Sequence, residues 1–341
     1  MAIAGPAAAD PAGLLLRRVQ KALRVAPDPS LDRVARALAR AQGDRPLAPE
    51  QALRAEGLAD PDPIVLGAAG ALDPSIASVE RAAKERFPAA GVTHVGAALA
   101  HGAAPGAEVV VLVGVRRLLE VGPLPKAPPA AGLVLRGTIL RGSAPTALLR
   151  APSGEVRALP VAAEARGLRL EIPFDEGPGG YALEILLRTD RGPEVAGVWS
   201  FAVDGDDRTA AEPLPAHDQQ DRLLPAINAL RAAHRRSPLR ASAALEAVAR
   251  ARAVELCRTT VARHVGADGS TPEQRAKRAG FSGGFVAENL AAAPSLARAH
   301  ENLLLSPSHR KNILDDRAGW IGIGTATSSA GACLAQIFGG A

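Results

Sequence analysis

The chain of 341 residues lacks features that would place it in a specialised class of protein. No apolar run approaches the roughly 20 residues that a helix needs to cross a bilayer, so we expect no transmembrane segment. The first ten residues, MAIAGPAAAD, have neither a basic n-region nor a long apolar h-region, and they are not a complete signal peptide. Either the protein is cytosolic, or this is a mature chain whose leader has been removed.

Cysteine is also scarce, with Cys257 and Cys333 as the two examples in the chain. Neither has a CxxC or zinc-finger spacing, so neither suggests a cysteine-based metal site. Both lie in the C-terminal third. Two arrangements therefore stay open: one disulfide in an exported domain, or two buried free thiols.

Aromatic residues make up 3% of the chain, and lysine is scarce whereas arginine and alanine are abundant. This bias is typical of a GC-rich coding genome rather than of a function. The net charge of +5 would suit nucleic acid or an acidic surface, but the arginines are spread along the chain among Asp and Glu. We interpret them as solvated helix faces and expect no nucleic-acid partner.

Length and composition shifts predict three domains in an α+β multidomain protein. Residues 1–121 form an α+β domain. A Pro-rich linker at 122–131 leads to an all-β domain at 132–204, and a polar linker at 205–216 precedes the last domain at 217–341.

Helical periodicity dominates the start of the first domain. It predicts two helices divided at Pro27-Asp28-Pro29, with Ser30 as the N-cap of the second, and a short helix that ends near Gly57. After a Gly/Ala-rich stretch we expect a helix at about 74–86 and two strands, at 93–99 and 109–115, joined by a Gly/Pro turn.

The middle domain contains short alternating runs separated by turn signals, which is the pattern of a small β-sandwich. The runs lie at 133–140, 146–150, 156–161, 168–172, 181–187 and 195–203. The segment Gly180–Ile185 resembles the immunoglobulin-like strand that carries a tyrosine corner, and Tyr181 is otherwise a plain core aromatic. An antibody-type disulfide is excluded because this domain contains no cysteine.

The last domain carries five short motifs in a fixed order. After His264 they read D-G-x-T-P-x-x-R at 268–275, E-N-L-A at 288–291, S-P-x-H-R-x-N-I-L at 306–314, I-G-x-G at 321–324 and Q-x-F-G at 336–339. Together they resemble the CAP superfamily, in its SCP-like form from bacterial secreted proteins. The resemblance implies an α-β-α sandwich.

The resemblance also implies that His264, Glu288 and His309 converge in an open cleft and hold a divalent metal, zinc or another. Imidazole and carboxylate suit such cations, and three ligands leave a coordination position open. Each imidazole also needs a hydrogen-bond partner to fix its tautomer. The second acidic residue of many animal members falls at Ser306 here. Glu301 lies about a turn too early, and we interpret it as a solvated helix residue.

Other polar residues of the motifs are expected to shape loops rather than to do chemistry. Thr271 and Gln274 predict a capping box for a helix that begins at Pro272. Ser306, beside His309, is expected to cap a turn rather than to act as a nucleophile. The residues that we expect to hold loops together are Arg275, Asn289, Arg310 and Asn312.

The first domain echoes the last in sequence. The parallels are Pro49–Gly57 with Pro272–Gly280, Leu31-x-x-Val-Ala with Leu245-x-x-Val-Ala, and Thr93–Gly96 with Trp320–Gly324. We hypothesise that residues 14–120 are a diverged, shortened CAP-like copy without the site, since Ala41 stands where His264 would lie. Coincidence between Ala/Arg-rich helices is the alternative, and a different strand order would contradict the hypothesis.

Three functions stay open, and whether the protein is an enzyme is not decided by its sequence. The first is a non-catalytic extracellular binding module whose His/Glu cleft holds a small lipid or carbohydrate ligand, or a divalent metal. The second is a hydrolase in which Glu288 is the general base and a bound cation the Lewis acid. The third is a structural or adhesive envelope protein. The resemblance implies an extracellular, periplasmic or cell-envelope location.

Overall fold

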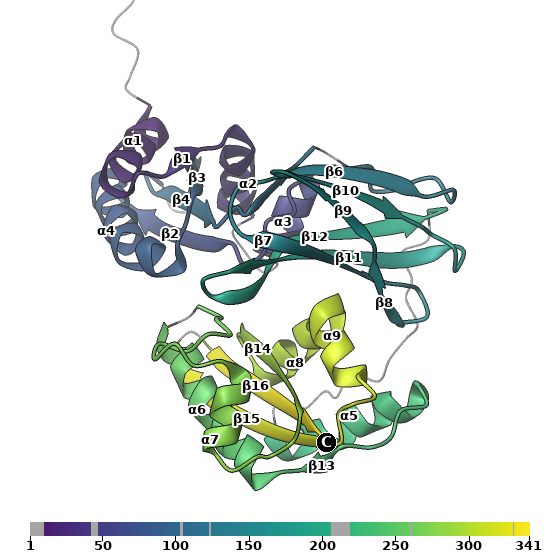
Figure 1. Ribbon diagram of the computed structural model, residues 1–341. Helices are drawn as coiled ribbons and strands as arrows, with labels where there is room; N and C mark the ends of the chain where they lie inside the picture. Colours follow the sequence, from purple (N-terminus) through teal and green to yellow (C-terminus); the bar gives the residue numbers. More distant parts are fainter. Residues whose placement is uncertain are drawn as a thin grey trace, which may run out of the picture. The chain divides into compact units, whose positions relative to one another are not determined.

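The computed structural model describes residues 10–41, 47–102, 105–122, 124–205, 219–259, 261–329 and 331–341. The chain forms two compact units, one from Met1–Leu124 with Ala196–Val198 and the other from Pro125–Val195 with Trp199–Ala341. Helices and sheets occur in both units, as expected for a multidomain α+β protein (Figure 1). None of the described helices combines the length and the apolar character needed to span a bilayer.

The first unit is built around a sheet in the order β1-β3-β4-β2. Strand β1 is parallel to β3, and the other neighbours are antiparallel. Its elements are α1 (Pro11–Leu23), β1 (Ala26–Pro27), α2 (Pro29–Arg40), α3 (Pro49–Ala55), β2 (Ile64–Gly70), α4 (Leu72–Ala90), β3 (His94–His101), β4 (Glu108–Val115) and β5 (Leu119–Val121).

Helices cover both faces of this sheet. Alternate residues of β4 point in opposite directions and therefore pack with different helices. Val110 and Leu112 pack with α1 and α4, whereas Val111 and Val113 pack with α2 and α3. A strand buried on both faces is read from the sequence as a continuous apolar run, which is what Val109–Val113 is.

Two expectations for this unit need correction. The N-cap of α2 is Asp28, not Ser30: the Asp28 side chain accepts a hydrogen bond from the Ser30 amide at 2.7 Å, and Pro29 takes the first helical position. The Gly/Ala-rich stretch contains strand β2, which the sequence patterns did not predict. Its small residues hide the alternation of a strand, and pairing with β4 supplies the stability that propensity does not. Residues 103–104 of the predicted turn lie outside the described residues.

The middle of the chain forms two sheets that face each other in Figure 1. One contains β6, β10 and β9 as neighbours, and the other has the order β12-β11-β7-β8. The strands are β6 (Leu133–Ile139), β7 (Ser143–Arg150), β8 (Val156–Leu159), β9 (Val161–Glu164), β10 (Gly167–Ile172), β11 (Gly179–Thr189) and β12 (Gly192–Val203). The single run expected at 156–161 is two strands, because Pro160 between them cannot donate to a ladder.

Tyr181 is a buried aromatic residue between these two sheets, with 1% of its surface exposed. Its hydroxyl donates to the Gly177 carbonyl at 3.0 Å and accepts from the Glu176 amide at 3.1 Å. The ring meets Phe174 edge to face, with centroids 5.0 Å apart. The phenol therefore ties the turn before β11 to the strand itself.

The C-terminal domain, residues 219–341, repeats the sheet arrangement of the first unit. Its strand order is β13-β15-β16-β14, with β13 parallel to β15 and the other neighbours antiparallel. The elements are α5 (Gln220–Ala233), β13 (Arg240–Ala241), α6 (Ala243–Thr259), α7 (Pro272–Arg278), β14 (Phe285–Ala293), α8 (Leu296–Leu305), α9 (Pro307–Leu314), β15 (Trp320–Ser328) and β16 (Gly331–Gly340).

Strand β16 separates two apolar layers in this domain. Ala335 and Ile337 pack with α6 and α7, whereas Leu334 and Phe338 pack with α5, α8 and α9. Gly322 of β15 lets α6 approach the sheet, since a Cβ there would overlap the backbone of Leu245. This close packing fixes α6, and with it the segment that follows the helix.

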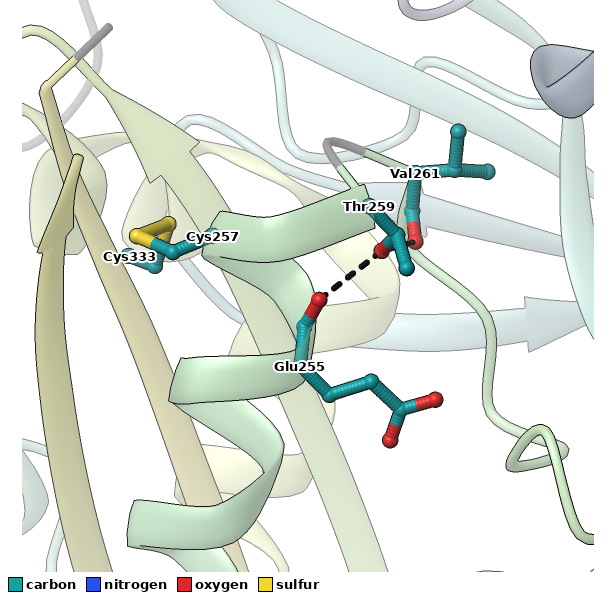
Figure 2. The surroundings of a disulfide bond; sticks show 5 residues. All are labelled: Glu255, Cys257, Thr259, Val261 and Cys333. Atoms are coloured by element: carbon teal, nitrogen blue, oxygen red, sulfur yellow. Dashed lines mark hydrogen bonds between the residues drawn. A yellow bond between two sulfur atoms is a disulfide. The ribbon is translucent and has the colours of Figure 1, made fainter. Parts of the chain in front are cut away.

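Cys257 at the end of α6 and Cys333 on β16 form a disulfide, which decides between the two open arrangements (Figure 2). The bond joins a helix to the strand beneath it across 76 residues of sequence. It closes a loop that includes most of the domain, so it strongly reduces the conformational entropy of the unfolded chain.

His300 is buried in the C-terminal domain, with 1% of its surface exposed. Its Nδ1 lies 3.3 Å from Nε2 of Gln336, and Gln336 accepts a hydrogen bond from Asn289. Burial lowers the pKa of His300 to about 4, because the protein interior disfavours the charged imidazolium. The folded protein therefore holds this side chain neutral at neutral pH.

We expect the disulfide to stabilise the C-terminal domain by about 2 to 4 kcal/mol, because it removes loop entropy from the unfolded state. Urea unfolding can be followed by the fluorescence of Trp320 in a Trp199→Phe background, with and without reductant. The Cys257→Ala/Cys333→Ala variant should match the reduced protein and ignore reductant. Equal unfolding midpoints for oxidised and reduced protein would contradict this expectation.

We expect His300 to make the domain less stable in acid. At pH values between the ordinary pKa of histidine, near 6.5, and the folded value of about 4, the imidazole of His300 is protonated in the unfolded chain but not in the folded chain. His300 by itself should therefore lower the stability by about 2 kcal/mol as the pH drops from 7 to 4.5. His300→Gln should lose that much less over the same interval in urea unfolding. Parallel losses in both proteins would contradict the assignment.

Candidate functional site

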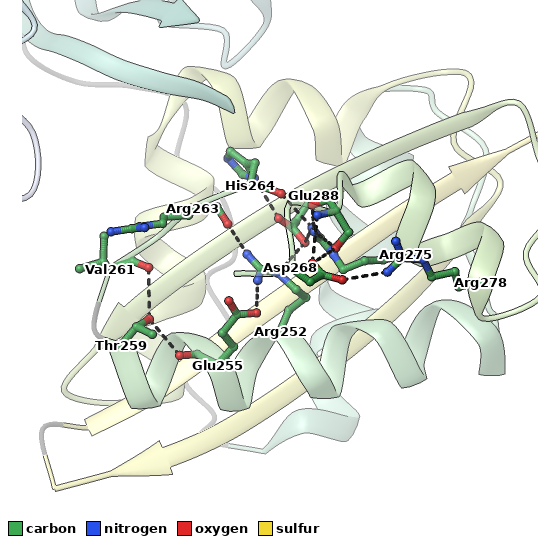
Figure 3. A network of polar contacts seen from close by, with 11 residues as sticks. Arg252, Glu255, Thr259, Val261, Arg263, His264, Asp268, Arg275, Arg278 and Glu288 are labelled. Atoms are coloured by element: carbon green, nitrogen blue, oxygen red, sulfur yellow. Dashed lines mark hydrogen bonds and ion pairs between the residues drawn. The ribbon is translucent and has the colours of Figure 1, made fainter. Parts of the chain in front are cut away.

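Glu288 on β14 is the centre of a polar network, and none of its side-chain surface is exposed. Its Oε1 lies 3.0 Å from Nδ1 of His264. Its Oε2 accepts from Arg252 Nε at 3.1 Å and from Arg275 Nη2 at 2.8 Å (Figure 3). The sheet, α6, α7 and the loop between the two helices thus each contribute one member.

The protonation of Glu288 follows from these contacts. Burial alone would raise the pKa of the carboxyl group, because it disfavours the charged form. His264, Arg252 and Arg275 outweigh burial and lower the pKa below its ordinary value. Glu288 is therefore an anion that two guanidinium groups neutralise, and it is the fixed partner of one imidazole.

Arg252 is the member of the network that the sequence analysis missed. Its side chain is 4% exposed, and it also pairs with Glu255 and donates to the Arg263 carbonyl. A signal was present, because Arg252 continues the apolar face of α6 that Leu245 and Val248 begin. A charged residue at a core position of a helix needs a buried partner of opposite charge.

The loop that carries His264 is held by Arg275. The guanidinium donates to the His264 carbonyl at 3.0 Å and to the Ser270 carbonyl at 2.6 Å. Arg275 is placed by the short helix α7, which begins with the predicted capping box between Thr271 and Gln274. The expected loop-holding role of Arg275 is therefore confirmed, with the contact to Glu288 in addition.

His309 lies in the first turn of α9. The predicted cap is confirmed, because the hydroxyl of Ser306 accepts from the His309 amide at 3.4 Å. Asn289 donates to the His309 carbonyl at 3.0 Å and accepts from Asn312 at 2.9 Å. Burial, and secondarily the nearby His264, lowers the pKa of His309 to about 3, so its imidazole is neutral at pH 7.

Edge strand β14 contacts both histidine-bearing segments. Glu288 and Asn289 are consecutive, so their side chains point to opposite faces of the sheet. Glu288 fixes His264 on the face covered by α6 and α7, and Asn289 fixes the backbone of His309 on the face covered by α8 and α9. The His264 side chain is 26% exposed, whereas His309 is a half-buried residue.

A metal site of three protein ligands is not assembled in the part of the chain that the structure describes. No group of three or more His, Cys, Asp or Glu side chains there lies close enough to hold an ion. The carboxylate oxygens of Glu288 face His264, Arg252 and Arg275. The atoms that could still bind a metal are Nε2 of His264 and the two ring nitrogens of His309. None of these three atoms forms a hydrogen bond among the described residues.

Two other sequence expectations concern α8 and α9. Glu301 pairs with Arg298 of its own helix at 2.6 Å, in keeping with a solvated helix residue. Arg310 is fully buried, and its Nε donates to the Gly154 carbonyl at 2.6 Å. Arg310 thus holds segments together over a much longer sequence distance than the motif suggested.

Comparison with known families identifies this part of the chain. Residues 224–338 match the family model of CAP, the cysteine-rich secretory protein family. No curated protein is similar enough in sequence to count as a relative.

Three solved structures are similar to parts of the chain. An outer surface protein from Borrelia burgdorferi is 26% identical over 35% of this chain and 90% of its own, with a TM-score of 0.33. An extracellular protein containing an SCP domain from Bacillus anthracis is 17% identical over 62% of this chain and 83% of its own, with a TM-score of 0.32. A cysteine-rich secretory protein from Staphylococcus aureus is 13% identical over 61% of this chain and 76% of its own, with a TM-score of 0.30. Because these scores are low, the family match carries the conclusion: residues 224–338 of this chain are a CAP domain.

Proposed function

We propose that the protein is secreted or associated with the cell envelope, and that its CAP domain is a non-catalytic binding module. The ligand is a small molecule, a lipid or carbohydrate among the candidates, or a divalent metal. The observation that carries this proposal is the pair of histidines beside β14, whose backbone carbonyls both accept side-chain hydrogen bonds, from Arg275 and from Asn289.

Glu288 acts in this proposal as an orienting residue rather than as a ligand. A histidine that binds a metal donates its other N–H to a carboxylate in many sites, which fixes the ring and its tautomer. The contact between Glu288 and Nδ1 of His264 has this form and leaves Nε2 free to bind. Zinc would be held by His264 Nε2 and His309, with water completing its shell, and it would supply a Lewis acid.

The extracellular location is supported by two observations. The Cys257–Cys333 disulfide is of a kind that persists in oxidising compartments. The similar solved proteins are described as an outer surface protein, an extracellular protein and a cysteine-rich secretory protein. Those descriptions belong to those proteins, and we extend the location to this chain as a proposal.

Binding is favoured over hydrolysis by the state of the candidate catalytic groups. His264 and two arginines lower the pKa of Glu288 despite its burial and make it a weakly basic carboxylate, whereas a general base works best with a pKa near the operating pH. The Ser306 hydroxyl caps α9 through the amide of His309. Neither group is arranged for attack on a substrate. A purely structural or adhesive role remains the alternative, and a site that binds nothing would favour it.

We further propose that the chain has three domains, at 1–121, 132–204 and 217–341, and that the middle one is an immunoglobulin-like spacer. The two facing sheets and the hydroxyl contacts of Tyr181 support the immunoglobulin-like assignment. In a tyrosine corner the hydroxyl binds backbone a few residues upstream of the strand, as it does here at Gly177.

The first domain is, in our proposal, a CAP-like copy that has lost its site. The strand orders β1-β3-β4-β2 and β13-β15-β16-β14 correspond element by element, with the same strand directions. Gly96 packs against the backbone of Leu31 as Gly322 packs against that of Leu245. These are the same places in the two sheets.

Strand register extends the comparison to the site. Across the second sheet, Gly322 is level with Ile337 and then with Glu288. Across the first, Gly96 is level with Val113 and then with Val65. Valine thus stands where the CAP domain has its central carboxylate. The neighbouring Asn289–Gln336 pair corresponds to Leu66–Leu112, so apolar side chains occupy all three positions in the first sheet.

We expect the full chain to bind zinc with about one equivalent and the His264→Ala/His309→Ala variant to bind none. Isothermal titration calorimetry at pH 7 measures this, with His101→Ala as a matched control, because His101 is an exposed histidine of the first unit. Equal binding by both variants would overturn the site. No binding by the folded wild-type chain would reject the metal and leave an organic ligand or the structural role.

Glu288→Gln should weaken zinc binding roughly 10- to 100-fold without abolishing it, as expected for a group that orients a ligand. Glu255→Gln is the matched control, since Glu255 also pairs with Arg252 but does not contact His264. Complete loss of binding in Glu288→Gln, with the fold retained by circular dichroism, would instead make Glu288 a direct ligand.

A further inference from the structure

Helix α9, which carries His309, begins against a carboxylate of the β-sandwich. Glu184 of β11 is 2% exposed, and its Oε2 accepts a hydrogen bond from the Ser308 amide at 2.8 Å. The first amides of a helix have no partner within the helix, and the positive end of the helix dipole favours an anion there. Glu184 thus caps a helix that lies 124 residues later in the chain.

The segment that carries His264 also touches the sandwich. The amide of Val265 donates to the Arg191 carbonyl at 3.1 Å, in the turn between β11 and β12. Gly192 follows with a φ of +97°, and a Cβ at that position would lie 3.2 Å from the Cβ of His264. The turn therefore lies directly against His264, at a position where glycine suits both the backbone and the space.

Arg310 joins α9 to the sandwich beside these contacts. It is fully buried, and besides the Gly154 carbonyl it contacts Nε2 of His234 at 3.0 Å. His234 in turn lies 2.8 Å from Glu155, which follows Gly154. Because Arg310 can only donate, His234 accepts through Nε2 and donates through Nδ1.

Strand β11 is buried on both of its faces. Tyr181, Leu183 and Ile185 fill the sandwich core, and yet Ala182 and Glu184, which point the other way, are also buried. A buried carboxylate without a donor is costly, so this face of the sandwich is adapted to α9 and not to water.

We propose that the sandwich domain positions both histidines of the CAP domain: Glu184 holds the helix that carries His309, and the Arg191–Gly192 turn holds the segment that carries His264. The sandwich is then a part of the site, in addition to any role as a spacer. Glu184 is a positioning residue, since it acts through Ser308 and not on a ligand. This inference goes beyond the proposed function because it concerns the geometry of the site whatever binds there.

Amide hydrogen exchange of the full chain tests the inference without any ligand. The Ser308 amide should be protected in the wild-type protein, although the first turn of a helix normally exchanges fast. Glu184→Ala should speed its exchange about tenfold or more, because a hydrogen bond to a charged group is lost. Glu184→Gln keeps an acceptor oxygen and should restore most of the protection. Glu171→Ala, an exposed sandwich carboxylate, is the matched control.

A chemical readout connects this to the histidines. Carbethoxylation by diethyl pyrocarbonate, followed by mass spectrometry at pH 7, should modify His309 faster in Glu184→Ala than in Glu184→Gln or Glu171→Ala. The exposed His101 should react equally in all of them. Fast exchange of Ser308 in the wild-type chain would overturn the inference even if Glu184→Ala fails to fold. Unchanged His309 reactivity in a folded Glu184→Ala would also overturn it. Neither outcome depends on whether zinc binds.

Discussion

The burial of one carboxylate, Glu288, is the constraint on which the candidate site depends. Removing an anion from water costs several kcal/mol unless its lone pairs are satisfied. The domain meets this need with Arg252 from α6, Arg275 from α7 and His264 from the loop between them. The same contacts that make Glu288 tolerable inside the protein therefore fix the ring of His264. The ring of His264 is therefore oriented by the same contacts that form when the domain folds.

The second histidine depends on a simple property of strands. Because side chains alternate along β14, a polar pair at consecutive positions can serve both layers of helices. Glu288 reaches the layer of α6, and Asn289 reaches the carbonyl of His309 on α9.

Sequence patterns predicted the elements whose residues alternate or recur clearly, and they failed where small residues hide the period. The runs of β4 and β11 were evident, whereas β2, with its Gly and Ala residues, was not. For the site, motif order indicated His264, Glu288 and His309, but a motif does not reveal which partner a side chain has. Arg252 could have been found as a charge on an apolar helix face. The role of Glu184 could not have been found, because its partner, Ser308, lies 124 residues later in the chain, in helix α9.

The first sheet shows that the same strand order forms without a carboxylate at the level of Glu288. With the same strand order, it has Val65 at the level of Glu288 and packs it against the apolar layer of α2 and α3. Apolar residues in place of a buried ion pair are often neutral or stabilising, so this position of the sheet needs no carboxylate in order to fold. The CAP domain nonetheless keeps Glu288, two arginines and the Asn289–Gln336 pair in its interior. These groups fix the ring of His264 and the backbone of His309, whereas apolar residues stand at the corresponding positions of the first sheet.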